Sequence, residues 1–326
     1  MHHSSFASHG HWPVEATAEL PTRSPAVVLS PLERACVETV AYADVFDCAL
    51  TESELHRYLV GVEADRVAVR TALASDRVAG GFLWRSGGYV TLAGREQLVE
   101  RRRECAEHGA RLWPEAVRYG ALLARFPFVR LVAVSGALAV DNAGVNGDID
   151  FFIVTEPDRL WLCRGLVIGV VRWAARRGVT LCPNYFLSER MLALDPPSLF
   201  AAHEVTQMVP VGHTGTYRRF RRLNRWTDCF LPNAVGAPRV IAARSNRHSR
   251  WSLAAEWAGR TSWGGRVERW EQTRKIGRLS RRARGHDEAR FSAEWCKGHF
   301  GRYGDRVRLG LRERLHALQL LPDAAE

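Results

Sequence analysis

Two aspartates separated by one residue, Asp148 and Asp150, carry the clearest chemical signal in this chain of 326 residues. They run directly into an apolar segment, residues 151–154, which predicts a buried strand. Because alternate side chains of a strand point to the same face, we expect the two carboxylates to lie side by side. Carboxylates that lie so close repel each other, and a divalent cation that prefers oxygen ligands, such as Mg2+, would stabilise them. The pair is therefore a candidate metal site.

The residues before the pair predict the elements that position it. Residues 129–134 are apolar apart from Arg130 and include three valines, which favours a second buried strand. A small turn, Ser135-Gly136-Ala137, and a short helix-compatible stretch follow. The loop 141–147 is rich in turn residues and leads into the aspartates. The expected order is strand, glycine turn, short helix, loop and strand.

This order resembles the signature of the nucleotidyltransferase superfamily, which includes DNA polymerase beta and the aminoglycoside nucleotidyltransferases. That signature is an apolar residue, Gly, then Gly or Ser, a spacer, and Asp-apolar-Asp/Glu-apolar. Gly136, Ala137, a ten-residue spacer and Asp148-Ile149-Asp150-Phe151 fit it. Ala137 departs from the usual Gly or Ser, and Ser135 offers a hydroxyl just before the glycine instead.

The resemblance implies an α/β (α+β) fold with a mixed sheet flanked by helices. It also implies an enzyme that uses Mg2+ or Mn2+ to move a nucleoside monophosphate from an NTP to an acceptor hydroxyl, releasing pyrophosphate. Asp148 and Asp150 would hold the metal, and Ser135 with the Gly136 amide would hold the phosphates. The acceptor stays open among a small molecule, a protein side chain and an RNA 3′ end.

In the resembling family a third strand supplies a further carboxylate, which completes the metal site and accepts the proton of the attacking hydroxyl. Residues 179–187 predict that strand here, and they contain no acid. Asn184 takes the most plausible position, and Glu189 is the nearest acid beyond it. Either Glu189 substitutes, or two acids suffice, or the protein is a catalytically inactive regulator that binds nucleotide or nucleic acid. Glu189 also fits a plain helix N-cap role.

The N-terminal part divides into three expected segments. Residues 1–30 predict a flexible tail whose histidines offer metal ligands. Residues 31–93, with three helices and a hairpin turning at Ser86-Gly87-Gly88, resemble a winged helix. Since this module holds 6 arginines against 9 acids, DNA binding through it is disfavoured, and so is a plain transcription factor. Residues 94–126 predict a helical connector to the nucleotidyltransferase-like core at 127–195.

Residues 196–326 predict a basic helical C-terminal domain. From residue 216 onward the chain carries 25 Arg or Lys and 11 Asp or Glu, so nucleic acid is a candidate partner there. Six of the eleven tryptophans also lie in this region, and the expectation is that they form a helical core. Earlier in the domain, His203, Glu204 and Gln207 share one helix side, as a surface stripe or a pocket lining.

The composition also indicates where in the cell the protein is expected. The apolar stretch at 160–175 contains Arg164 and Arg172 and is too short to span a bilayer, so no membrane is expected. The N-terminus shows no secretory signal. Seven scattered cysteines without a CxxC pair indicate reduced thiols and a cytoplasmic location.

Overall fold

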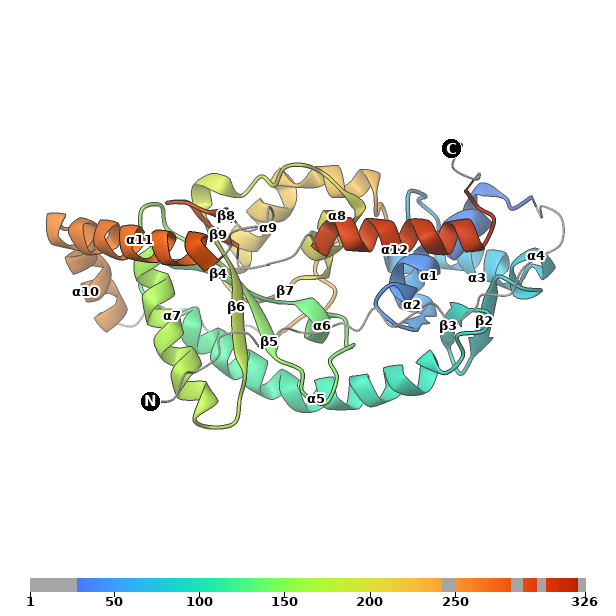
Figure 1. Cartoon of the computed structure of the whole chain (residues 1–326), viewed down its shortest axis with the longest axis horizontal. Coiled ribbons are helices and arrows are strands. Elements are labelled where there is room, and N and C mark those ends of the chain that lie inside the picture. The colour runs from blue at the N-terminus through green and yellow to red at the C-terminus, as the bar shows by residue number, and fades with distance from the viewer. Residues whose placement is uncertain (1–27, 242–249, 283–289, 298–302, 322–326) are drawn as a thin grey trace.

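The computed structural model describes residues 28–241, 250–282, 290–297 and 303–321. Most of the expected N-terminal tail, residues 1–27 with its histidines, lies outside this range. The fold is α+β, as expected, with a small sheet and a larger mixed sheet. The small sheet and its helices lie at one end of an elongated molecule, and the large sheet lies towards the other (Figure 1).

The N-terminal module has the expected helices and hairpin. Ser30 and Glu33 form a capping box at the first helix, and Thr51 and Glu54 form another at the second. The hairpin turns through two glycines with positive φ, as a tight turn requires. The elements are α1 (Pro31–Asp44), β1 (Leu50–Thr51), α2 (Glu52–Arg57), α3 (Arg66–Ala74), α4 (Asp76–Ala79), β2 (Leu83–Ser86) and β3 (Tyr89–Leu92).

The predicted connector is one long helix, α5 (Leu98–Leu123), which runs along the molecule from the N-terminal module to the large sheet (Figure 1). One of its faces is apolar along its second half, where Trp113, Ala116, Tyr119 and Leu123 are buried in the core of the large sheet. The helix therefore holds the two ends of the molecule together and forms part of the sheet's cover.

The large sheet has the strand order β7-β4-β5-β6-β9-β8. β5 and β6 are parallel, because α7 (Leu160–Ala175) crosses between them, and the other neighbouring pairs are antiparallel. The strands are β4 (Val129–Ser135), β5 (Ile149–Thr155), β6 (Leu181–Ser188), β7 (Val209–Gly212), β8 (Arg290–Phe291) and β9 (Trp295–Lys297). A four-residue helix, α6 (Gly136–Ala139), follows β4.

Alternation along the strands divides the sheet into two apolar faces. Ile149, Phe151 and Ile153 of β5 face α5 and α7, whereas Phe152 and Val154 face the other side. That second face is covered by α8 (Leu199–Gln207) and α9 (Thr214–Leu223). Asp150 has the parity of Phe152, so its side chain lies on the face that α8 covers.

The sheet extends beyond the core segment expected at 127–195. β7 pairs with β4, and β9 pairs with β6, so residues from the expected C-terminal domain complete the same sheet. These strands are three or four residues long, too short for an alternating pattern to stand out in the sequence. The C-terminal part is otherwise helical, with α10 (Arg250–Gly259), α11 (Ser262–Arg282) and α12 (Tyr303–Ala317).

The last helix, α12, packs against the first helix, α1, at the N-terminal module (Figure 1). Leu315 of α12 and Leu318, which directly follows this helix, join the buried core of that module. The Arg314 guanidinium pairs with the Asp44 carboxylate, Nε to Oδ2 at 2.6 Å, and donates to the Asp44 carbonyl at 3.0 Å. Both side chains are buried, and the other Asp44 carboxylate oxygen accepts a hydrogen bond from Arg95 at 2.9 Å, so the buried carboxylate has two guanidinium partners.

The expectation that the C-terminal tryptophans form a core is wrong for three of them. Trp257, Trp263 and Trp270 are 75%, 71% and 63% exposed. Trp295, by contrast, is buried beside Tyr185 in the large sheet. Among the helices of the described residues, none is both long and apolar enough to span a membrane.

Candidate functional site

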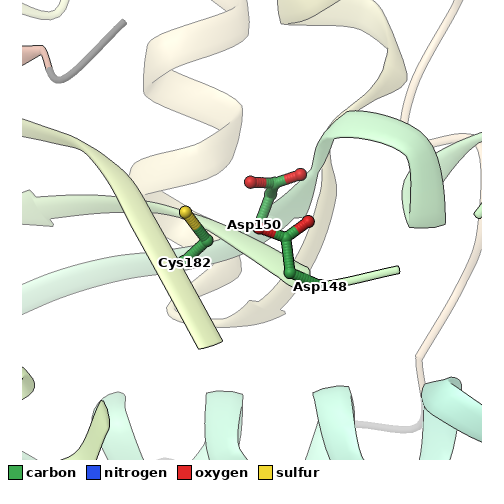
Figure 2. A group of neighbouring side chains, drawn as sticks. All are labelled: Asp148, Asp150 and Cys182. Atoms are coloured by element: carbon green, nitrogen blue, oxygen red, sulfur yellow. The ribbon is translucent and has the colours of Figure 1, made fainter. Parts of the chain in front are cut away.

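The two aspartates lie side by side at the start of β5 (Figure 2). One carboxylate oxygen of Asp148, one of Asp150 and the Sγ of Cys182 all lie within 4.8 Å of one another. All three side chains are half-buried, so solvent reaches the group from one side. Ile149, between the aspartates, is fully buried in the opposite core, which fixes the register of the pair.

The glycine turn is packed directly against Asp150. Gly136 has φ +62°, a conformation that side chains with a Cβ rarely adopt. A Cβ placed there would lie 2.1 Å from Asp150 Oδ2 and 2.9 Å from its Cγ, far inside contact distance. Glycine is therefore required at this position twice over, for its backbone angle and for the space that the Asp150 carboxylate occupies.

Ser135 is the cross-strand partner of Asp150 in the β4–β5 register. Side chains of directly opposite residues project from the same face, with Cβ atoms about 5 Å apart. The Ser135 side chain does not cap the helix that follows it. The hydroxyl and the Gly136 turn thus lie beside the carboxylates, where the sequence placed them.

A bulge in β6 brings Asn184 to the aspartates. Asp150 pairs with Cys182 and Phe152 pairs with Tyr185, so Pro183 and Asn184 together stand opposite one residue of β5. Asn184 Nδ2 donates to Asp150 Oδ1 at 2.5 Å, and the Cys182 thiol donates to Asn184 Oδ1 at 2.9 Å. The amide oxygen is thus already engaged, and Asn184 supports Asp150 as a hydrogen-bond donor.

The electrostatics of the pair favour protonation when no cation is present. Burial raises the pKa of Asp150 well above its ordinary value, and the charge of Asp148 raises it further. The hydrogen bond from Asn184 lowers this pKa and offsets part of the shift. Burial also raises the pKa of Asp148, and the neighbouring Cys182 side chain offsets part of this shift. Burial and the two carboxylate charges raise the pKa of Cys182, which therefore stays a thiol.

The site fits a divalent cation. No arginine or lysine among the described residues pairs with Asp148 or Asp150, or lowers the pKa of either one. Two half-buried carboxylates without a balancing positive charge are costly, and a bound cation would remove that cost. Because the donors are oxygens and the nearby sulfur is a protonated thiol, the set suits Mg2+ or Mn2+ better than a soft metal.

The structure does not bring Glu189 to the pair. Asp150 is in register with Cys182 at the start of β6, whereas Glu189 follows the last residue of that strand, opposite the end of β5. Seven residues of strand separate them, which corresponds to about 20 Å. Glu189 is a first-turn acid of a short 3-10 helix whose N-cap is Ser188, so the N-cap alternative is wrong in its position, and a Glu189 carboxylate oxygen lies 3.8 Å from an Arg219 guanidinium nitrogen.

A different acid, Glu204 of α8, was expected only as part of a surface stripe or a pocket lining, and its relation to the aspartates was not predicted. This helix covers the sheet face from which Asp150 projects, and the adjacent Val205 packs in one cluster with Phe152. Burial is the main cause that raises the pKa of Asp150 and of Tyr303, at the start of α12, and the charge of Glu204 adds to both shifts. Glu204 thus acts on Asp150 through its charge from α8, outside the close group of Asp148, Asp150 and Cys182.

The helical stripe expected from His203, Glu204 and Gln207 is not a surface stripe. His203 is buried, stacks on Tyr42 with ring centroids 3.8 Å apart, and bonds through Nδ1 to the Leu199 carbonyl. Burial lowers the pKa of His203 to about 4, so the ring is neutral near pH 7. The helix was predicted from its sequence, whereas the burial of His203 and the effect of Glu204 on Asp150 depend on tertiary packing.

The chain matches no protein-family model, and searches among curated proteins and solved structures returned no match either. We therefore infer the function from the residues of the site themselves.

Proposed function

We propose that the chain is a Mg2+- or Mn2+-dependent nucleotidyltransferase that transfers a nucleoside monophosphate from an NTP to an acceptor hydroxyl. One observation carries the proposal: Asp148 and Asp150 lie together, half-buried and without a balancing cation among the described residues, against the turn at Gly136. The strand, glycine turn and Asp-x-Asp arrangement that resembles the superfamily signature supports it.

The chain's own residues would divide the work as follows. Asp148 and Asp150 hold the cation, which supplies positive charge to the triphosphate and to the attacking oxygen. Asn184 and Gly136 hold the Asp150 carboxylate in place from two sides. The Ser135 hydroxyl and the Gly136 amide lie where the outer phosphates of the nucleotide would be held.

Glu204 is our candidate for the third carboxylate in this reaction. The acceptor oxygen bonds to the α-phosphorus, the bond from that phosphorus to the pyrophosphate oxygen breaks, and the hydroxyl proton passes to Glu204. A carboxylate is suited to this role, which contributes about 10² to 10⁴ in rate where it operates. Its position on α8, over the face that carries Asp150, supports the assignment.

The test is pyrophosphate release with each of the four NTPs and Mg2+ or Mn2+, with total RNA or cell extract as the source of acceptor. Asp150→Asn should abolish release, and Glu204→Gln should lower it about 100-fold or more. Glu189→Gln is the matched control, because this acid lies at the far end of β6 and should leave release unchanged. Full release by the Asp150→Asn variant would refute the proposal.

A second candidate is a catalytically inactive protein that binds nucleotide or nucleic acid. It is favoured by Asn184, which donates to Asp150 from the strand where the resembling family has a carboxylate. Nucleotide binding that depends on Mg2+ and on Asp150, without pyrophosphate release under any condition, would select this candidate. A cytoplasmic location, suggested by the free cysteines, belongs to either proposal.

A further inference from the structure

One face of α11 carries two tryptophans and four arginines. Its members follow one another at intervals of three or four residues, which places them on one side of the helix. We call this set the Trp–Arg stripe; it consists of Trp263, Arg266, Trp270, Arg274, Arg278 and Arg281, all of them exposed. Trp263, Arg266, Val267 and Trp270 line a shallow hollow on it.

The opposite face of α11 anchors the helix to the large sheet. Ile276 and Leu279 pack against the core beneath α7. Glu268 is buried and accepts the backbone N–H groups of Trp161 at 2.9 Å and Leu162 at 2.7 Å, at the start of α7. This anchored face explains the position of the helix, and it leaves the Trp–Arg stripe without a structural role within the described residues.

α11 carries more positive than negative charge, and much of the excess lies on the Trp–Arg stripe. The helix has seven Arg or Lys and two Glu, and one of these acids, Glu268, is turned into the protein. The other, Glu271, pairs with Arg274 and Lys275. No acid among the described residues pairs with Arg266, Arg278 or Arg281. The stripe therefore combines flat aromatic surfaces with unneutralised positive charge.

We infer that the Trp–Arg stripe binds single-stranded nucleic acid. Exposed bases stack on aromatic side chains, and arginines neutralise the phosphates between them, which is how single strands are held without reading their sequence. Trp263 and Trp270 lie seven residues apart, about 10 Å along the helix, so a strand of a few nucleotides reaches both. Arg274 lies over the Trp270 ring, 5.0 Å from its centroid, and stiffens that platform.

The placement of the tryptophans and arginines on α11 favours a nucleic acid over a membrane surface as the partner. Helices that lie in a bilayer interface separate an apolar face from a basic one. On α11 the arginines share the face of the tryptophans, and the other face is occupied by the protein. The stripe lies beside the start of α7, which follows the end of β5, whereas Asp150 lies at the beginning of β5. Strand binding is thus separable from the proposed reaction.

The experiment uses the full chain and a fluorescent single-stranded RNA of 15 nucleotides, with binding followed by anisotropy. Trp263→Ala and Trp270→Ala should each weaken binding about tenfold, since a base stacked on an aromatic side chain contributes about 1–3 kcal/mol. Trp270→Phe should keep most of the affinity, and Trp270→Leu should not, because leucine keeps the apolar surface but not the stacking. Arg278→Ala should reduce the salt dependence of binding.

Arg308→Ala is the matched control for lost charge, because Arg308 is equally exposed but lies on α12. Single-stranded DNA of the same sequence should bind as well, and duplex RNA should bind more weakly. The inference is overturned if no single strand binds, if the Trp263→Ala/Trp270→Ala double variant binds normally, or if duplex binds as tightly. Preference for vesicles containing phosphatidylserine over RNA would also overturn it. Mg2+-dependent nucleotide binding should survive in every stripe variant, which separates this test from that of the reaction.

Discussion

Replacing Gly136 by alanine should damage the site through one atom. The new Cβ would lie 2.1 Å from Asp150 Oδ2, whereas real Cβ contacts essentially never fall below 3.0 Å. The Asp150 carboxylate must therefore shift by about an ångström, which breaks the 2.5 Å hydrogen bond from Asn184. The pair would then no longer present its oxygens together.

Two contributions add in the free energy of unfolding. An alanine at φ +62° costs about 1–2 kcal/mol, whatever its surroundings. Displacing Asp150 from its hydrogen-bond partner should add about 1–3 kcal/mol. Gly178→Ala is the matched control, because Gly178 has φ +75° and nothing lies within 4 Å of a Cβ placed there. The control should show the backbone cost alone.

The assay is urea unfolding of both variants, with Mn2+ binding measured on each by titration calorimetry. We expect Gly136→Ala to lose more stability than Gly178→Ala and to lose Mn2+ binding, which the control keeps. Adding Asp150→Ala to Gly136→Ala should recover the difference, because the clash is then gone. Equal destabilisation by the two glycine substitutions, or unchanged Mn2+ binding by Gly136→Ala, would show that the close packing on Asp150 is wrong.

Three further outcomes follow from buried charges. Asp150→Asn should raise the melting temperature in EDTA, and increasingly so as pH rises, since burial raises the pKa of Asp150 and its ionisation destabilises the folded state. Glu33→Gln should cost up to about 3 kcal/mol at pH 7 and almost nothing near pH 2. The pKa of Glu33 is lowered to about 2 by the neighbouring Ser75 hydroxyl and by hydrogen bonds from the Ser30 N–H and from Arg77, so its stabilisation is present above about pH 4.5 and is lost below that; a constant cost in denaturant titrations across this range would contradict the reasoning. Arg314→Leu should cost about 1.5–3 kcal/mol, measured by urea unfolding, because the buried Asp44 loses the charged hydrogen bond from Arg314 and keeps Arg95 as its guanidinium partner; an unchanged free energy of unfolding would contradict this.

The local features of the site were predictable from the sequence. The Asp-x-Asp pattern gives two carboxylates on one strand face, and the turn residues before it give the glycine turn. Asn184 was expected on the third strand, and the structure places it there. These predictions succeed because each depends on a few neighbouring residues and on the period of a strand.

The features that depend on tertiary packing were not predictable. Glu189 follows the aspartates closely in sequence, but β6 carries it a full strand length away. Glu204 is further along the chain, and α8 folds back over the sheet face that carries Asp150. The exposure of Trp263 and Trp270 contradicts the usual burial of large aromatics, and no local pattern indicated it. These positions and exposures depend on which elements pack together in the tertiary structure.

Because α12 packs against α1, the core of the N-terminal module cannot be completed until α12 has been synthesised. Arg314 is 270 residues after Asp44, its buried partner. At ordinary rates of synthesis, about 5–20 residues per second, the first helix emerges roughly 15–50 s before the last one. During that interval Asp44 has Arg95 but lacks Arg314, and the apolar surface that Leu315 and Leu318 later cover stays open. The part of the chain that is made first is thus completed last, and faster elongation would shorten the time during which this apolar surface can associate with other chains.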